Sequence, residues 1–219
     1  MFKLSKNIAF TMAEVLMVIG IIGVVSALTL PNLNNKSDEQ VNVAKAKKVY
    51  SDLSTSVDRV ALKYGDTKRD SNTFSVANVT KYLNASMKTK GSGATYWYQS
   101  GDCANNAVAL SDGSAYCVLE VSGTNYNSNI FKNIMIDVDG SKKGLNAIGA
   151  DVFYATLFIP KDTTEPIELR PWKNDSNATF TNTTKPSEKD YLHWVTMYDN
   201  EDYRECPDKL YYQNVTTCR

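Results

Sequence analysis

The stretch "NIAFTMAEVLMVIGIIGVVSALTLP", from Asn7 to Pro31, decides how the whole chain is interpreted. Val15 to Leu30 include no charged residue, and with the residues just before them the apolar run reaches about 20 residues, enough for a helix to cross a ~30 Å hydrocarbon layer. Lys3 and Lys6 precede the run. The positive-inside rule therefore predicts a cytoplasmic N-terminus and places everything after Pro31 outside the membrane.

An acid at the start of this run must be explained by any interpretation of it. An ionisable group at membrane depth costs roughly 2–3 kcal/mol or more. A plain signal anchor accounts for the length and the basic residues, but it leaves Glu14 unexplained. A secretory signal is the other simple alternative, because "SALTLP" at 26–31 imitates a small-residue cleavage site.

A third interpretation rests on the order of residues around this acid. Ala9 is followed by Phe10 and Thr11, then by Glu14 and the run "VLMVIGIIGVV". This pattern resembles the N-terminus of type IV pilins and type II secretion pseudopilins, in which a short basic leader ends in a small residue. That residue is usually Gly in the family, so Ala9 is a departure, although Ala is still small enough for a tight peptidase site.

The resemblance implies how the chain is processed and where it goes. A prepilin peptidase would remove residues 1–9 by cutting between Ala9 and Phe10, and would methylate the new Phe10 amine. The helix would be kept, as a single-pass anchor in the cell membrane with a periplasmic or extracellular C-terminal domain. An inner-membrane assembly platform would then join it to other pilin-like subunits in a pilus or a secretion pseudopilus.

Within this interpretation Glu14 has an assembly role. It lies about one helical turn beyond the Phe10 amine, so in a stack of helices it can meet the Phe10 ammonium of a neighbouring subunit. A buried charge becomes tolerable when an opposite charge neutralises it, and the pair would set the axial register. The alternative is that Glu14 is protonated or reaches back to the cytoplasmic interface. Pro31 is expected to kink the helix.

The helical pattern continues beyond the apolar run. The next apolar residues recur at spacings of four, four, three and four, which is the stripe of an amphipathic helix: Val49, Leu53, Val57, Val60 and Tyr64. Gly65 is a natural C-terminal stop. We therefore expect one helix from about Phe10 to Tyr64.

Charge gives little sign of a nucleic-acid partner. The chain has 24 Lys and Arg residues against 24 Asp and Glu, so its formal net charge is zero. A local basic cluster, Lys45, Lys47 and Lys48, could contact acidic lipid or DNA, but a solvated helix face is the expectation. Nucleic acid is therefore an unlikely partner.

The remaining chain predicts an α+β fold, with the long N-terminal helix packed on an antiparallel β-sheet in a pilin-like arrangement. Asp112-Gly113 marks a hairpin turn. The expected parts are a leader at 1–9, an apolar helix at 10–31, its amphipathic continuation at 32–65 and an exterior domain at 66–219. Within that domain we expect a short helix at 76–86, strands at 94–100, 130–140 and 151–160, a hairpin at 107–121, and an irregular tail over 161–219.

A glycine-rich element between two expected strands carries three acids. Its pattern resembles an element of many pilin-like proteins at Asp137, Gly140, Asn146, Gly149, Asp151 and Phe153. Asp137, Asp139 and Asp151 offer oxygen ligands suited to calcium. The favoured alternative is a loop organised by Asx side chains without any metal.

Four cysteines lie in the expected exterior domain: Cys103, Cys117, Cys206 and Cys218. An even number in an oxidising compartment predicts two disulfides, with three possible pairings. Local pairing favours Cys103–Cys117 and Cys206–Cys218. The second would close the C-terminus, as in many pilins.

Signatures of catalysis are missing from the sequence. It has no GxSxG, P-loop or HExxH motif, and the single histidine, His193, lies in an apolar, strand-like run where a structural role is expected. We expect no enzyme and no cofactor other than calcium. A structural filament subunit is the first hypothesis, and the alternative is a membrane-tethered, minor pilin-like binding module, an adhesin or a DNA-capturing subunit, that acts through the aromatic, polar tail.

Overall fold

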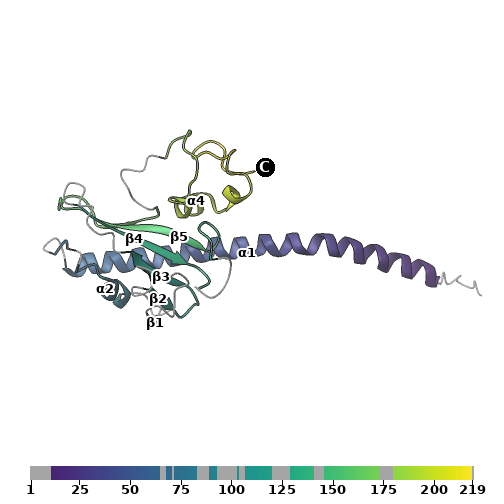
Figure 1. Cartoon of the computed structure of the whole chain (residues 1–219), viewed down its shortest axis with the longest axis horizontal. Helices are drawn as coiled ribbons and strands as arrows, with labels where there is room; N and C mark the ends of the chain where they lie inside the picture. The colour runs from purple at the N-terminus through teal and green to yellow at the C-terminus, as the bar shows by residue number, and fades with distance from the viewer. Residues whose placement is uncertain are drawn as a thin grey trace, which may run out of the picture. The chain divides into compact units, whose positions relative to one another are not determined.

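The computed structural model shows an α+β protein (Figure 1). Its contacts divide the chain into two compact units, Met1–Asp38 and Glu39–Arg219. The structure describes residues 11–64, 68–70, 72–82, 89–92, 103, 107–119, 129–140, 146–172 and 180–218, without the side chains of 27–36, 76 and 89–92. The strand expected at 94–100 lies outside the described residues.

One helix, α1 (Met12–Tyr64), extends over 53 residues. It confirms the predicted long helix and its end at Tyr64. The helix includes position 31, so the proline there does not end it, and the kink expected at Pro31 stays a prediction.

The second unit contains a six-stranded sheet in which every strand pairs antiparallel with its neighbours in sequence. The predicted hairpin and the two predicted long strands are confirmed. The strands are β1 (Thr89–Ser92), β2 (Ala107–Leu110), β3 (Ala115–Leu119), β4 (Ile130–Asp137), β5 (Val152–Ile159) and β6 (Glu168–Arg170). Gly91 and Ser92 belong to β1, because backbone pairing with β2 needs no particular side chain.

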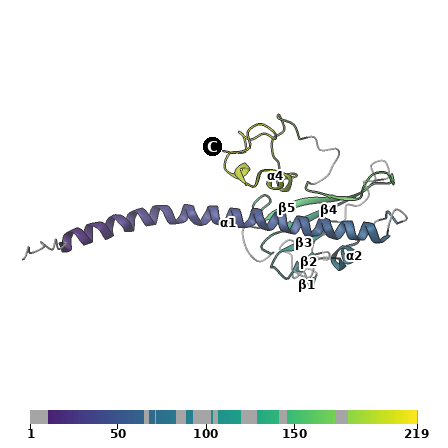
Figure 2. The same cartoon turned by 180° about the vertical axis from the view of Figure 1, so that it is seen from behind.

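The core of this unit forms between the sheet and the part of α1 that begins at Glu39. Four residues of the predicted helical stripe are at most 1% exposed: Val49, Leu53, Val57 and Val60. They share one cluster with inward-facing residues of the sheet, such as Tyr116, Ile136 and Phe153. Figure 2 shows this part of α1 lying along the sheet. The 3.6-residue periodicity of the stripe thus corresponds to the buried face of the helix.

Hydrogen bonds from α1 fix two other elements. Ser56 donates to the carbonyl of Val79 in α2 (Val76–Lys81), which is shorter than the helix predicted at 76–86. Tyr50 donates its hydroxyl to the carbonyl of Leu169 in β6 at 2.7 Å. The helix therefore holds the outer parts of the domain as well as its core.

The irregular tail expected over 161–219 is wrong in large part. It contains β6, the helix α4 (Tyr191–Tyr198) and a short 3-10 helix, η4 (Asp202–Arg204). The strand-like run around His193 is helical. A short apolar run does not distinguish a strand from a buried helix by periodicity alone. Here Leu192, Trp194 and Val195 are all buried, so the helix is stabilised by packing.

Candidate assembly site

The first turn of α1 is closed by a reciprocal pair of hydrogen bonds between Thr11 and Glu14. Thr11 N donates to Glu14 Oε2 at 2.8 Å, and Glu14 N donates to Thr11 Oγ1 at 3.3 Å. The Thr11 hydroxyl also donates to Glu14 Oε2 at 2.8 Å. This is a capping box, in which the residue before the helix and the third helical residue satisfy each other's free amides. Our sequence reasoning missed it, although the Thr-x-x-Glu spacing signals it.

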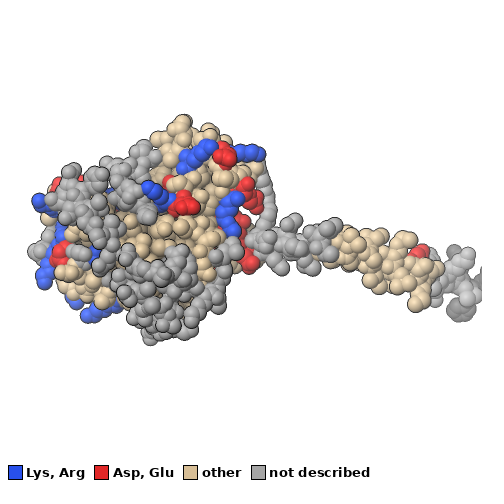
Figure 3. Space-filling view, in the orientation of Figure 1, with Lys and Arg blue, Asp and Glu red and all other residues tan. Residues whose placement is uncertain are grey.

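Apart from Glu14, the surface of α1 between Met12 and Val25 is mainly apolar on all sides. Ten large apolar side chains are between 46% and 82% exposed: Met12, Val15, Leu16, Met17, Val18, Ile19, Ile21, Ile22, Val24 and Val25. Glu14 is the only charged residue between Thr11 and Ser26 (Figure 3). A helix that is hydrophobic all round is typical of a buried environment, and an exposed apolar surface of this extent marks an interaction site.

Among the residues whose side chains are described, no helix is both long enough and apolar enough to cross a membrane. The membrane segment predicted at 10–31 extends past those residues at both ends, because Phe10 and the side chains of 27–31 are not described. Ala9 and the predicted cleavage point also lie outside the described residues.

On the part of α1 that begins at Glu39, here called its second part, two of the three lysines of the basic cluster are paired with acids of the same domain. Lys47 forms an ion pair with Asp199, which follows α4. Lys48 lies 3.0 Å from Asp112 in the β2–β3 turn and 3.7 Å from Asp52 one turn along the helix. These side chains are partly exposed, so each pair contributes little to stability. Their pairing agrees with a solvated helix face.

The carboxylates of the predicted calcium loop bind backbone amides. Asp137 Oδ1 accepts from Asp139 N at 3.2 Å and from Gly140 N at 2.8 Å. The two oxygens of Asp151 accept from Asn146 N at 2.8 Å and from Ala147 N at 2.7 Å. Burial raises the pKa of Asp137 to about 7, and the neighbouring Asp139 carboxyl acts in the same direction. The described part of this loop is thus organised by Asx side chains.

The predicted calcium ligands differ in how their oxygens are satisfied. The described residues include no group of three His, Cys, Asp or Glu side chains that could hold a metal ion. Both oxygens of Asp151 accept from backbone amides, whereas Asp137 Oδ2 and Asp139 Oδ1 are buried without a hydrogen-bond partner among the described residues. Calcium binding therefore stays a prediction from the sequence.

Two glycines of this element are required by close packing. Gly149 has φ +84°, and a Cβ there would meet the ring of Tyr191. Gly140 has φ +92°, and a Cβ there would meet the carbonyl oxygen of Gly113. Both positions combine a left-handed backbone with a neighbour in the way, which only glycine tolerates.

Both predicted disulfide pairings are confirmed. Cys103 pairs with Cys117, with their Cα atoms 5.3 Å apart, and Cys206 pairs with Cys218 at 5.9 Å. The first links β3 to the segment before β2, and the second closes the C-terminal segment. Neither pair leaves a thiol for chemistry.

His193 lies in an aromatic cluster of the second unit. Its ring stacks on Phe180 with centroids 4.0 Å apart and meets the edge of Trp172 at 5.4 Å. Burial lowers the pKa of His193, which favours the neutral ring. A neutral histidine packed between aromatic rings agrees with the structural role that we expected.

The fold and the site define an α+β protein in which a sheet packs on the second part of one long helix. The first part of that helix, from Met12 to Val25, is apolar and exposed. Comparison with models of known protein families gives no match, and comparisons with curated proteins and with solved structures also give none.

Proposed function

We propose that this chain is a pilin-like structural subunit that is cut after Ala9 by a prepilin peptidase and assembled through the first part of α1. The filament would be a type IV pilus or a type II secretion pseudopilus. The observation that carries the proposal is the exposed apolar surface between Met12 and Val25, directly behind a short basic leader. The subunit performs no chemistry, and its work is mechanical.

In this proposal the apolar surface is buried in two different environments, one before assembly and one after it. Before assembly, lipid covers it, with Lys3 and Lys6 on the cytoplasmic side. After assembly, the same surface packs against other copies of the helix. Gly20 and Gly23 have open space where a Cβ would stand, so they leave room for a neighbouring helix to approach.

The carboxylate of Glu14 serves two partners in this proposal. The capping bonds from Thr11 both fall on Oε2, and no described residue bonds the other oxygen, Oε1. The Oε1 atom can therefore accept the Phe10 ammonium of a neighbouring subunit while the capping box stays intact. The acid is then neutralised between copies, which removes its cost in an apolar environment.

The mature N-terminus tests the processing step. Mass spectrometry of the protein from a membrane or filament fraction should give a chain that begins at N-methylated Phe10. An intact Met1 in assembled material would contradict the proposal and support a plain signal anchor. A chain that begins beyond Pro31 would support a cleaved secretory signal.

Matched variants separate the charge of Glu14 from its capping role. Glu14→Gln keeps an acceptor for the Thr11 amide but removes the charge, whereas Thr11→Ala keeps the charge but removes the capping hydroxyl. We expect Glu14→Gln to insert in the membrane and to lose most filaments in electron micrographs, as Glu14→Ala should. Thr11→Ala should retain filaments. Normal filaments in both Glu14 variants would contradict charge pairing between subunits.

The alternative of a minor pilin-like binding module rests on the aromatic tail. Three of its largest side chains, Trp194, Tyr203 and Tyr212, are at most 2% exposed. They belong to the core of the domain, so they are not available to an external ligand. No contact among the described residues favours this alternative over the structural role.

A further inference from the structure

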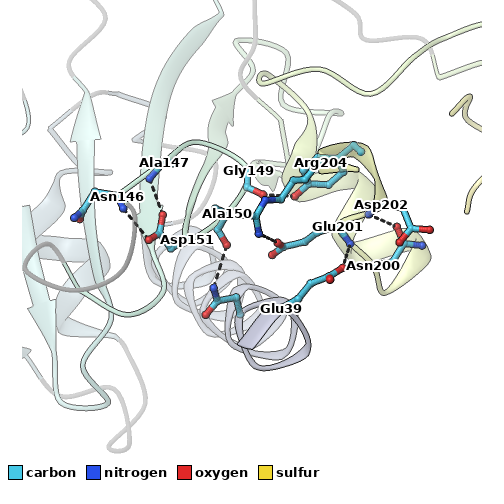
Figure 4. A network of polar contacts seen from close by, with 12 residues as sticks. Glu39, Asn146, Ala147, Gly149, Ala150, Asp151, Asn200, Glu201, Asp202 and Arg204 are labelled. Atoms are coloured by element: carbon cyan, nitrogen blue, oxygen red, sulfur yellow. Dashed lines mark hydrogen bonds and ion pairs between the residues drawn. The ribbon is translucent and has the colours of Figure 1, made fainter. Parts of the chain in front are cut away.

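A buried carboxylate joins the C-terminal segment, defined here as residues 199–218, to the rest of the second unit. Glu201 follows α4, and its side chain has no exposed surface. In Figure 4 this side chain points toward the loop that carries Gly149, Ala150 and Asp151, while its backbone lies against Glu39 of α1. Glu201 therefore lies where three elements meet.

Hydrogen bonds satisfy only one of the two carboxylate oxygens of Glu201. Its amide donates to Glu39 Oε1 at 3.0 Å, and Arg204 Nη1 donates to Glu201 Oε2 at 2.8 Å. Oε1 of Glu201 is buried without a hydrogen-bond partner among the described residues. A buried carboxylate with one unsatisfied oxygen is costly in its charged form, whereas a protonated oxygen is less so.

The charges around this carboxylate are mainly acidic. The charges of Glu39 on α1 and of Asp151 in the loop before β5 both raise the pKa of this carboxyl. The only cation among the described groups that influence its titration is Arg204, whose side chain is 41% exposed. Tyr203 is the remaining titratable neighbour, and its hydroxyl donates to the carbonyl of Gly149 at 2.8 Å.

We propose that Glu201 is a proton-operated lock, which holds the C-terminal segment on α1 and on the 146–151 loop when protonated and loosens it when ionised. The segment would respond as one piece, because the Cys206–Cys218 disulfide closes it and Cys218 N donates to Asp202 Oδ2 at 2.7 Å. This lock is a property of the folded domain, and it does not depend on the proposed filament role.

The direction of the pH response follows from the burial of this group. Burial raises the pKa of Glu201 from 4.5 to about 7, although Arg204 acts in the opposite direction. A raised carboxyl pKa stabilises the docked state at low pH, and this stabilisation is lost as pH rises from about 4.5 through about 7. If the open segment has the ordinary pKa, opening becomes on the order of 100-fold more favourable across that window.

Hydrogen exchange in the purified full-length protein tests the lock. Protection factors, which correct for the intrinsic exchange rate at each pH, would be measured by mass spectrometry between pH 4 and pH 8. We expect peptides of residues 199–218 to lose on the order of 100-fold protection across this range. Peptides of β5 should keep theirs and serve as the internal reference.

Three variants make the test specific. Glu201→Gln should abolish the pH dependence, whereas Glu205→Gln, at an exposed acid of the same segment, should leave it unchanged. Glu39→Gln keeps an oxygen for the Glu201 amide and removes a facing charge, so the midpoint should move to lower pH. An unchanged pH profile in Glu201→Gln would overturn the proposal. If that variant fails to fold, an unshifted midpoint in Glu39→Gln would overturn it instead.

Discussion

The two parts of α1 differ in the exposure of their apolar side chains. From Met12 to Val25 every large apolar side chain is at least 46% exposed. From Val49 to Val60 the apolar stripe is at most 1% exposed, and Asp52, Asp58 and Arg59 lie on the other faces. The second part is covered by the sheet of its own domain, while the apolar side chains of the first part are exposed.

The difference shows which forces hold each part. The second part is stabilised by tertiary packing, which supplies most helix stability in globular proteins. In the described residues of the first part, the Thr11–Glu14 capping box adds to the backbone hydrogen bonds of the helix. Substitutions in the second part should therefore change the stability of the domain, and substitutions in the first part should change association.

The largest expected effect comes from the buried stripe. Leu53→Ala should lower the free energy of unfolding by about 2–5 kcal/mol, because it removes a fully buried side chain and leaves a cavity. Chemical denaturation of the purified full-length protein would measure it. Leu62→Ala is the matched control on the same helix, where the side chain is 85% exposed, and it should stay within about 0.5 kcal/mol. Equal effects of the two changes would contradict the assignment of Leu53 to the buried face and Leu62 to the exposed face of α1.

The next effect concerns the closed C-terminal segment. Replacing both Cys206 and Cys218 with Ser should cost about 2–4 kcal/mol, because the open chain regains conformational freedom in the unfolded state. Calorimetry under non-reducing conditions would measure the change. An unchanged melting temperature would show that this segment is not part of the cooperative unit that contains the second part of α1.

A smaller effect is expected at the glycines of the 137–153 element. Gly149→Ala should destabilise by about 1–3 kcal/mol, because its backbone is left-handed and the ring of Tyr191 occupies the Cβ position. Gly113→Ala has a similar φ of +95° but open space around the Cβ, so it should cost about 1 kcal/mol. A Tyr191→Ala background should reduce the difference between these two variants, as denaturation curves can show.

The smallest effect is local to the first turn of α1. Thr11→Ala should cost about 1 kcal/mol of helix stability there, typical of a lost N-cap side chain. Hydrogen exchange of the first helical amides should become faster, while unfolding of the second unit stays unchanged. Thr11→Ser is the control, because serine keeps the capping hydroxyl. Destabilisation of the second unit by Thr11→Ala would mean that the two parts are not independent.

Periodicity and turn chemistry predict most of the described fold. The 3.6-residue stripe predicts the buried face of α1, the two apolar runs around Asp112-Gly113 predict β2 and β3, and local spacing predicts both disulfides. Each of these features is decided by residues close together in the sequence. They can therefore be inferred without knowledge of the tertiary structure.

The features that the sequence does not predict depend on distant residues. The run of α4 is short and apolar, and it becomes a helix because it packs on β5 and on Tyr212. Glu201 is an ordinary surface residue by its sequence context, and only its contact with Glu39, 162 positions away, makes it a buried acid. The capping box is the exception, since its spacing is local and was available to sequence reasoning.

Photo-cross-linking tests most directly whether other copies of the chain cover the first part of α1. A photoreactive amino acid would replace Leu16, which is 62% exposed in the first part, or Leu62, which is 85% exposed in the second. In intact cells we expect illumination to give dimers and longer ladders of this chain from position 16 and only monomer from position 62. Monomer alone from position 16, in cells that process and export the protein normally, would contradict the account.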